Sequence, residues 1–168
     1  IYYRMATNDQ LAAKLLRDAA TSGSPVNLGL AGVTYRRDSS CSINTGGAHT
    51  EDVSLTGTVA AGGYYVIAGT GGAFAPGNIL AATSLTTSHC ILITQGLEAA
   101  NAAANVHVID FVAWGTVTDN EGGVVAPGGT TTPNWIKRCA NGTDTNSNSA
   151  DFAAAGGNIS AGSANNCP

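Results

Sequence analysis

Four oxygen-bearing side chains near the C-terminus have a spacing that would suit a metal-binding loop. They are Asp144, Asn146, Asn148 and Asp151. Calcium loops of the EF-hand type present oxygens at alternate residues, as the first three of these do. Ser149 and Ala155 stand where such a loop has its glycine and its closing glutamate. The alternative is a turn in which short side chains accept hydrogen bonds from nearby backbone, so we expect no cofactor and keep calcium as the alternative.

The other side chains that could do chemistry lack the spacing that catalysis needs. The histidines His49, His89 and His107 do not form the HExxH pattern of a zinc site. No GxSxG turn offers a serine nucleophile. Asp110 stands in an apolar stretch, where we expect it to bind a backbone N–H or Arg138 rather than to act as a general acid. The sequence therefore predicts a protein that is not an enzyme.

The cysteines indicate an oxidising compartment. An even count at wide spacing, with no CxxC pair, favours two disulfides over a zinc site. Three pairings are open, and we favour Cys41–Cys90 with Cys139–Cys167, because the second bond would fix a tail rich in Gly, Ser and Asn. The four residues are Cys41, Cys90, Cys139 and Cys167.

Composition also favours a secreted or cell-surface protein. Charged residues make up 11% of the chain, against about a quarter in typical soluble domains. Seven basic residues against eleven acidic ones argue against a nucleic-acid partner. No apolar run is long enough to span a membrane. Sequons at Asn141 and Asn158 permit N-glycosylation.

Aromatic side chains offer one candidate ligand surface. Trp135 follows Pro133 and Asn134, and together with a tyrosine it could stack on a sugar ring. Tyr64 and Tyr65 must point to opposite faces if they lie on a strand, so one of them belongs to the core. The alternative for Trp135 is also a position in the core.

Short strands are the elements that must position these residues. Residues 106–115 are the longest stretch of β-formers and are apolar on both faces except at Asp110, so we expect this strand between layers and not at a sheet edge. Residues 9–20 have helical spacing, which favours a helix there. Many short segments separated by Gly and Pro predict one all-β domain over residues 1–168, with an irregular tail from about residue 140. The other expected strands are 1–5, 26–28, 32–36, 53–59, 64–68, 91–94 and 135–138.

Several stretches, in order, resemble the lamin-tail domain in the form found on secreted bacterial and other extracellular proteins. They are SPVNL at 24–28 with GVTY at 32–35, LTGTVAAGGYYVIAG at 55–69, VIDFVAWG at 108–115, and Lys137-Arg138 with GTDTNSNSADF at 142–152. The resemblance implies an immunoglobulin-like β-sandwich, here with room for one short N-terminal helix. It also implies a non-catalytic domain used in binding, scaffolding and surface display, sometimes beside nucleases or other enzymes. The acidic positions of the family's opening strands are missing here, but on this resemblance we favour a strand near residues 13–18 over a helix.

Taken together, the sequence predicts a non-enzymatic extracellular structural or adhesive module. Its expected partner is itself, in a homo-oligomer or filament, or a surface polymer or glycan. The alternative is a carbohydrate-binding module or an accessory domain of a secreted enzyme or nuclease.

Overall fold

The structure is a computed structural model of the 168-residue chain. It describes residues 2–4, 12–16, 25–29, 32–38, 41, 51–60, 63–69, 79–81, 87–95, 108–128, 135–138 and 144–155. None of the helices in these ranges is long and apolar enough to cross a membrane.

Strands dominate the described chain, which confirms the predicted all-β class. A four-stranded antiparallel sheet has the order β10 (Val108–Trp114), β9 (His89–Gln95), β4 (Val33–Asp38) and β5 (Glu51–Ser54). A two-stranded sheet joins β3 (Val26–Asn27) to β6 (Thr58–Val59). A six-stranded sheet has the order β12 (Phe152–Ala155), β11 (Trp135–Arg138), β1 (Tyr2–Arg4), β2 (Ala12–Leu16), β7 (Tyr64–Gly69) and β8 (Ile79–Ala81).

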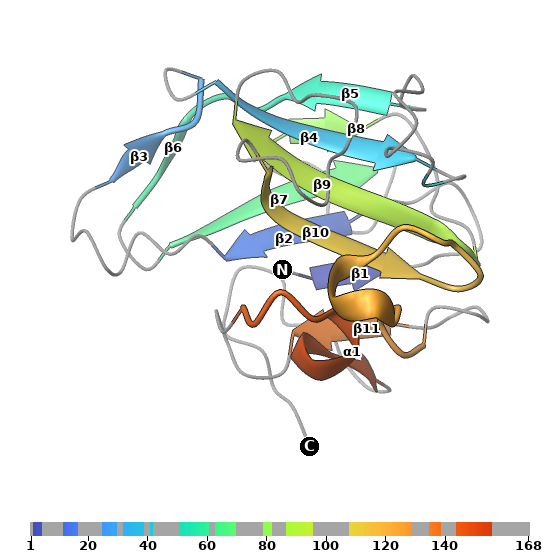
Figure 1. Cartoon of the computed structure of the whole chain (residues 1–168). Coiled ribbons are helices and arrows are strands. Elements are labelled where there is room, and N and C mark those ends of the chain that lie inside the picture. The colour runs from blue at the N-terminus through green and yellow to red at the C-terminus, as the bar shows by residue number, and fades with distance from the viewer. Residues whose placement is uncertain are drawn as a thin grey trace.

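Only two short helical turns accompany the strands in the described ranges. They are the 3-10 turn η3 (Glu121–Gly123) and the α-helix α1 (Asn148–Asp151). Figure 1 shows the four-stranded sheet in front of β2 and β7, with α1 and β11 at one end of the molecule. Within the six-stranded sheet, β7 and β8 run parallel, whereas the other neighbours are antiparallel.

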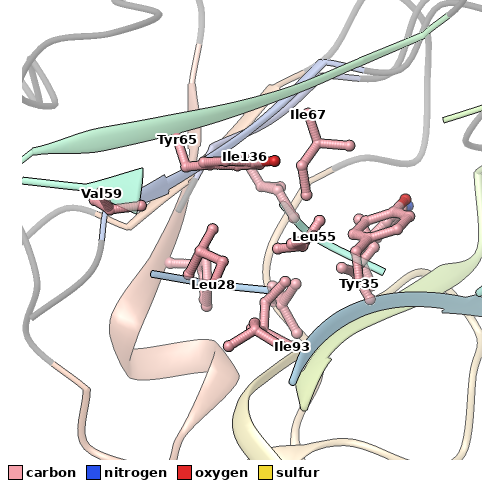
Figure 2. Packing of buried hydrophobic residues seen from close by; sticks show 14 residues of the cluster. Leu28, Tyr35, Leu55, Val59, Tyr65, Ile67, Ile93 and Ile136 are labelled. Carbon is pink, nitrogen blue, oxygen red and sulfur yellow. The ribbon is translucent and has the colours of Figure 1, made fainter. Parts of the chain in front are cut away.

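The main core joins the two larger sheets. Tyr65, Ile67 and Ile136 come from the six-stranded sheet, and Tyr35 and Ile93 come from the four-stranded sheet. Figure 2 shows these two groups on opposite sides of a layer that also holds Leu28 and Leu55. All seven are at most 3% exposed, so their burial is the main apolar contribution to stability.

A second, smaller apolar cluster lies on the opposite face of β9 and β10. It consists of Cys41, Cys90, Leu92, Phe111 and Ala113, with Val117 and Val125 packed against it. The strand β10 therefore contributes Val112 and Trp114 to the main core and the alternate residues Phe111 and Ala113 to this cluster. This is why its sequence is apolar on both faces.

The position of β10 in its sheet differs from the prediction. The predicted place between layers is confirmed, because the main core and the second cluster lie on the two faces of β10. Among the described strands, however, β10 pairs with β9 alone, so it is an edge strand, and this part of the prediction was wrong. Its outer face is covered by a loop. That loop brings Val117 and Val125 onto the outer face, and Ala126 N–H donates to the Ala113 carbonyl at 2.8 Å.

Residues 12–16 form β2, so the strand favoured near residues 13–18 is confirmed there and the helical alternative is not. Two other expected elements differ from the structure. The strand expected at 53–59 divides into β5 and β6 around Gly57, whose φ of +83° turns the chain out of the sheet. The predicted irregular tail contains α1 and β12, and β12 pairs with β11.

Candidate functional site

Ionisable side chains from four segments meet beside β10. Asp110 lies two residues before Val112 on the inner face of β10, and Arg138 ends β11. Glu121 begins η3, and Asp144 lies just before α1. One oxygen from each of the three acids lies within 4.8 Å of the others. We call these residues, together with Asp151 of α1, the acidic cluster.

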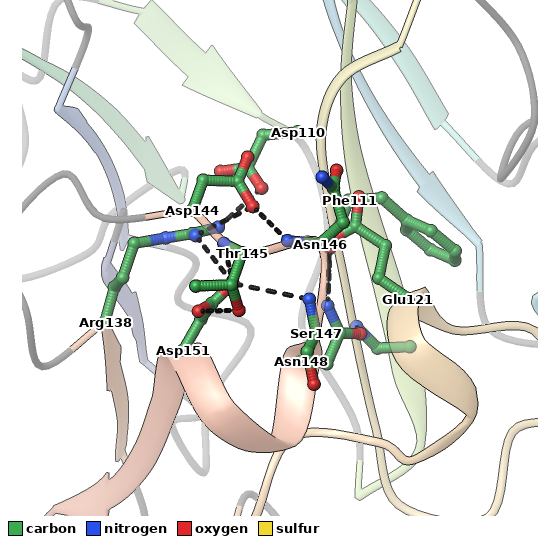
Figure 3. A network of polar contacts seen from close by, with 11 residues as sticks. Asp110, Phe111, Glu121, Arg138, Asp144, Thr145, Asn146, Ser147, Asn148 and Asp151 are labelled. Carbon is green, nitrogen blue, oxygen red and sulfur yellow. Dashed lines mark hydrogen bonds and ion pairs between the residues drawn. The ribbon is translucent and has the colours of Figure 1, made fainter.

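Arg138 binds three carboxylates of this cluster. Its Nη2 is 2.5 Å from Asp110 Oδ1, and its Nη1 is 3.4 Å from Asp144 Oδ1 and 3.3 Å from Asp151 Oδ2 (Figure 3). The guanidinium carbon also lies 4.5 Å from the centre of the Phe152 ring. The Arg138 side chain is 3% exposed. The expected contact between Asp110 and Arg138 is confirmed, and it fastens β11 to β10.

Asp151 is the best satisfied acid of the cluster. Thr145 donates its N–H to Asp151 Oδ2 at 2.9 Å and its hydroxyl to Oδ1 at 2.7 Å. Burial alone would raise the pKa of Asp151, but these bonds, with those from Ser147 and the charge of Arg138, lower it below its ordinary value. Asp151 is therefore an ionised structural group.

Asn148 closes the free edge of β10. Its Oδ1 accepts the Ala113 N–H at 2.8 Å, and its Nδ2 donates to the Phe111 carbonyl at 2.7 Å. The same Nδ2 lies 3.2 Å from Glu121 Oε2. Asn148 is 0% exposed, so these bonds replace the water that an open edge would bind.

The surroundings of Glu121 destabilise the ionised form of its carboxyl. Burial, followed by the charges of Asp110 and Asp144, raises its pKa to about 8, and Arg138 opposes this. Burial also raises the pKa of Asp110, again against the attraction of Arg138. At neutral pH the Glu121 carboxyl is therefore mostly protonated.

The acidic cluster has the oxygen ligands that a hard divalent cation prefers, but Arg138 already neutralises part of it. Asp110, Glu121 and Asp144 are the group whose oxygens lie close enough for an ion. Arg138 contacts two of these three, Asp110 and Asp144. This group differs from the set expected from the sequence, with which it shares Asp144 alone.

The side chains expected to bind calcium each make different contacts in the structure. Asp144 Oδ1 accepts the Asn146 N–H at 3.0 Å, which is an Asx turn, and Asn146 has a φ of +55°. Asn148 points to β10, and Asp151 binds Thr145 and Arg138. The geometry matches the alternative in which these side chains bind their own turn and their neighbours.

A second buried polar group lies near the other end of β10. The side chain of Arg37 donates from Nη1 to His89 Nε2 at 2.7 Å, because a guanidinium has no acceptor atom. His89 is thus neutral, and burial followed by the charge of Arg37 lowers its pKa to about 4. Its ring stacks on Trp114 with centroids 6.0 Å apart.

The disulfide adjoins this second group. Cys41 and Cys90 are bonded, with Cα atoms 5.7 Å apart, as the favoured pairing predicts. Cys90 lies opposite Ala113 of β10. Cys139 and Cys167, the sequons at Asn141 and Asn158, and the histidines His49 and His107 lie outside the described residues.

The aromatic residues are only partly available to a ligand. Tyr65 is 1% exposed and its hydroxyl donates to the Thr56 carbonyl at 2.8 Å, so it belongs to the core. Tyr64 is half-buried, as expected for its neighbour on a strand. The backbone of Trp135 lies in β11, and its side chain is outside the described residues.

Neither Glu121 nor the role of Asn148 was predicted from the sequence. Glu121 contacts Asn148 across 27 positions, and Asn148 contacts Ala113 across 35. No local pattern reports contacts over such separations. The one available signal was the apolar character of β10, which implies that something must cover its edge.

Comparison of the chain with protein-family models, with curated proteins and with solved structures gave no match.

Proposed function

We propose that this chain is a non-enzymatic extracellular module with an immunoglobulin-like β-sandwich of the lamin-tail type, acting in structure or adhesion with itself as partner. The observation that carries the proposal is the use of its buried polar side chains. Arg138 binds Asp110 and Asp151, and Asn148 binds backbone. These contacts fasten β11 and α1 to β10.

The disulfide supports an extracellular place for such a module. A bond between Cys41 and Cys90 persists in oxidising compartments and is rare in the cytosol. A chain with 11% charged residues also presents few long, flexible charged groups at its surface. Both features suit a protein that makes lasting contacts outside the cell.

The N-terminal strand β1 is not an edge of its sheet. Within its own sheet β1 already pairs with β11 on one side and with β2 on the other. Besides β10, whose edge Asn148 and Ala126 cover, the end strands of the two larger sheets in the described ranges are β5, β8 and β12, so these are the edges to which a second copy could add. Of these, β5 carries the exposed residues Asp52 and Ser54.

Sedimentation velocity over a wide range of protein concentration, with negative-stain images of the most concentrated sample, tests the proposal. We expect defined multimers or filaments. The variant Ser54→Lys adds a charge to the β5 edge and should weaken association if copies join there, whereas Thr58→Lys, on β6, is the matched control. Monomers at every concentration, together with binding to one member of a panel of insoluble glycans, would replace this proposal by the carbohydrate-binding alternative.

A further inference from the structure

Two asparagines that each precede a serine lie close together in the chain but in different surroundings. They are Asn146, which precedes Ser147, and Asn148, which precedes Ser149. An asparagine amide can react with the backbone nitrogen of the next residue, and a small next residue leaves that nitrogen accessible. The other asparagines in the described ranges precede a leucine and a glutamate. The structure therefore decides which of the two Asn-Ser pairs is able to react.

The side chain of Asn146 is exposed, and nothing among the described residues holds its amide. Its one bond there runs from its backbone N–H to Asp144 Oδ1 at 3.0 Å, and its amide takes part in none of the contacts drawn in Figure 3. Asn146 belongs to no helix or strand, and its φ of +55° lies in the left-handed region, which is costly for a residue other than glycine. The amide carbon is thus open to attack, and a change of backbone conformation here breaks no regular secondary structure.

The nitrogen that would attack is weakly held. The Ser147 N–H donates to Asp151 Oδ2 at 3.5 Å, whereas good N–H···O bonds are about 2.7–3.2 Å long. Thr145 and Arg138 bind the same carboxylate at shorter distances. Ser147 is the residue before α1, so its N–H takes no part in a bond within that helix. Little is therefore lost when this nitrogen turns towards the Asn146 side chain.

Asn148 has the same kind of neighbour in the sequence and none of this freedom. It is 0% exposed, and its amide binds the Ala113 N–H, the Phe111 carbonyl and the Glu121 carboxyl. The nitrogen that follows it belongs to Ser149 inside α1. Attack on this amide requires the loss of all three bonds in a buried site, where no water replaces them. Asn148 is therefore an internal control for Asn146.

We propose that Asn146 is a site of spontaneous deamidation, with the backbone nitrogen of Ser147 as the nucleophile. This nitrogen loses its proton and bonds to Asn146 Cγ, the Cγ–Nδ2 bond breaks, and the amide nitrogen takes up a proton and leaves as ammonia. Water then opens the succinimide ring that has formed. Opening at Cγ gives aspartate, and opening at the backbone carbonyl carbon gives isoaspartate. The site is a property of the single chain, so it does not depend on the proposed function.

The two products differ in what they do to the segment before α1. Either one adds a negative charge to a turn that already holds Asp144. Isoaspartate also adds a carbon atom to the main chain between Thr145 and Ser147, and both of these residues donate their N–H groups to Asp151. The second product therefore lengthens the link that leads into α1.

Ageing of the full, oxidised chain in mildly alkaline buffer made with heavy-oxygen water tests the site. The sample is then digested in ordinary water at acid pH, and tandem mass spectrometry assigns each new, labelled carboxyl to its residue. We expect label at residue 146 to appear at least about tenfold faster than at residue 148, a ratio equivalent to about 1.4 kcal/mol. Both aspartate and isoaspartate should form at residue 146, because direct hydrolysis of the amide would give aspartate alone.

Two controls separate the structure from the sequence. Asn146→Gln lengthens the side chain by one methylene and disfavours ring closure, so label at residue 146 should disappear while that at residue 148 stays unchanged. In concentrated guanidinium chloride, Asn146 and Asn148 should react at similar rates, because both precede serine. Equal rates in the folded chain, a difference that persists in denaturant, or aspartate as the single product at residue 146 would each overturn the proposal.

Discussion

At the Asp110 end of β10 the neighbouring segments are held by charge, whereas towards Trp114 they are held by a covalent bond and stacked rings. The first region joins β11 and α1 to β10 through Arg138 and its carboxylates. The second joins the chain after β4 to β9 through the Cys41–Cys90 disulfide, beside the neutral His89. Both regions are buried, but their stabilities depend on different conditions.

The difference shows how one strand can have a constant end and a responsive end. A disulfide does not titrate, and its contribution is the same at every pH at which it stays oxidised. A cluster with more acids than bases changes its internal repulsion as protons leave. The segments that the cluster fastens, η3 and α1, are therefore the ones whose attachment should vary with conditions.

The largest effect is expected from breaking the ion network. In Arg138→Met the buried Asp110 and Asp151 lose their cation, which should lower the free energy of unfolding by about 3–5 kcal/mol. Urea unfolding measures this loss. In the double variant with Asp110→Asn the loss should be smaller than the sum of the two single losses, because the unpaired charge is gone. Strictly additive losses would show that the pair does not act as a unit.

Breaking the covalent end should cost somewhat less. The disulfide closes a loop with a sequence separation of 49, so Cys41→Ala with Cys90→Ala should lower the free energy of unfolding by about 2–4 kcal/mol. The same urea series, repeated at acid and alkaline pH, should give the same loss each time. A loss that varies with pH would remove the contrast between the two ends.

A backbone change can separate close packing from conformational strain. Gly122 and Gly123 have nearly equal φ values, +77° and +79°, but only Gly122 touches Ser147. Gly122→Ala should destabilise by about 1–3 kcal/mol, since it adds a steric clash to the strain. Gly123→Ala carries the strain alone and should cost about 1 kcal/mol. Thermal unfolding of the two variants measures the difference, and equal losses would mean that η3 does not need its close contact with α1.

The smallest effect is an opposite pH dependence at the two ends. The pKa of Glu121 rises from 4.5 to about 8, so the folded chain holds this proton more tightly and loses stability as pH rises through that window. The pKa of His89 falls from 6.5 to about 4, so stability is lost as pH falls from 6.5 towards 4.

Single variants isolate the two groups. Glu121→Gln should gain about 1 kcal/mol relative to the wild-type chain between about pH 6 and pH 8, a value reduced for the partial exposure of the side chain. His89→Gln keeps an acceptor for Arg37 and should gain by a similar amount as pH falls below about 6. Chemical unfolding at a series of pH values provides both curves. Parallel curves for the two variants would contradict the assignment of opposite titrations.

Local sequence patterns predicted most of the strands, but they did not predict the positions of these strands in the sheets. Residues 64–68 and 135–138 alternate or cluster β-formers, and β7 and β11 lie there. The segment Phe152–Ala155 has three alanines and no alternation, so only its pairing with β11 makes it a strand. The edge position of β10 was also invisible, because both of its faces are buried although it pairs with β9 alone among the described strands.

The candidate site was predictable from the sequence only where a residue type requires a particular kind of partner. A carboxylate in an apolar strand needs a cation, which led from Asp110 to Arg138. Asn148 has an oxygen that suits either a metal or a backbone N–H, and the sequence could not choose between them. The structure resolves this choice, because Ala113, which is distant in the sequence, donates its N–H to the Asn148 oxygen.

The Cys41–Cys90 bond also determines how the chain responds to force. The strands β5, β6, β7 and β8 all lie between the two cysteines, so tension applied at the chain ends bypasses them. A segment of 49 residues has a contour length of about 170 Å, and this length cannot be drawn out while the bond is intact. Under load the molecule would therefore lengthen only through the segments outside the loop, the β11–α1–β12 region among them, and would retain a covalently closed remainder.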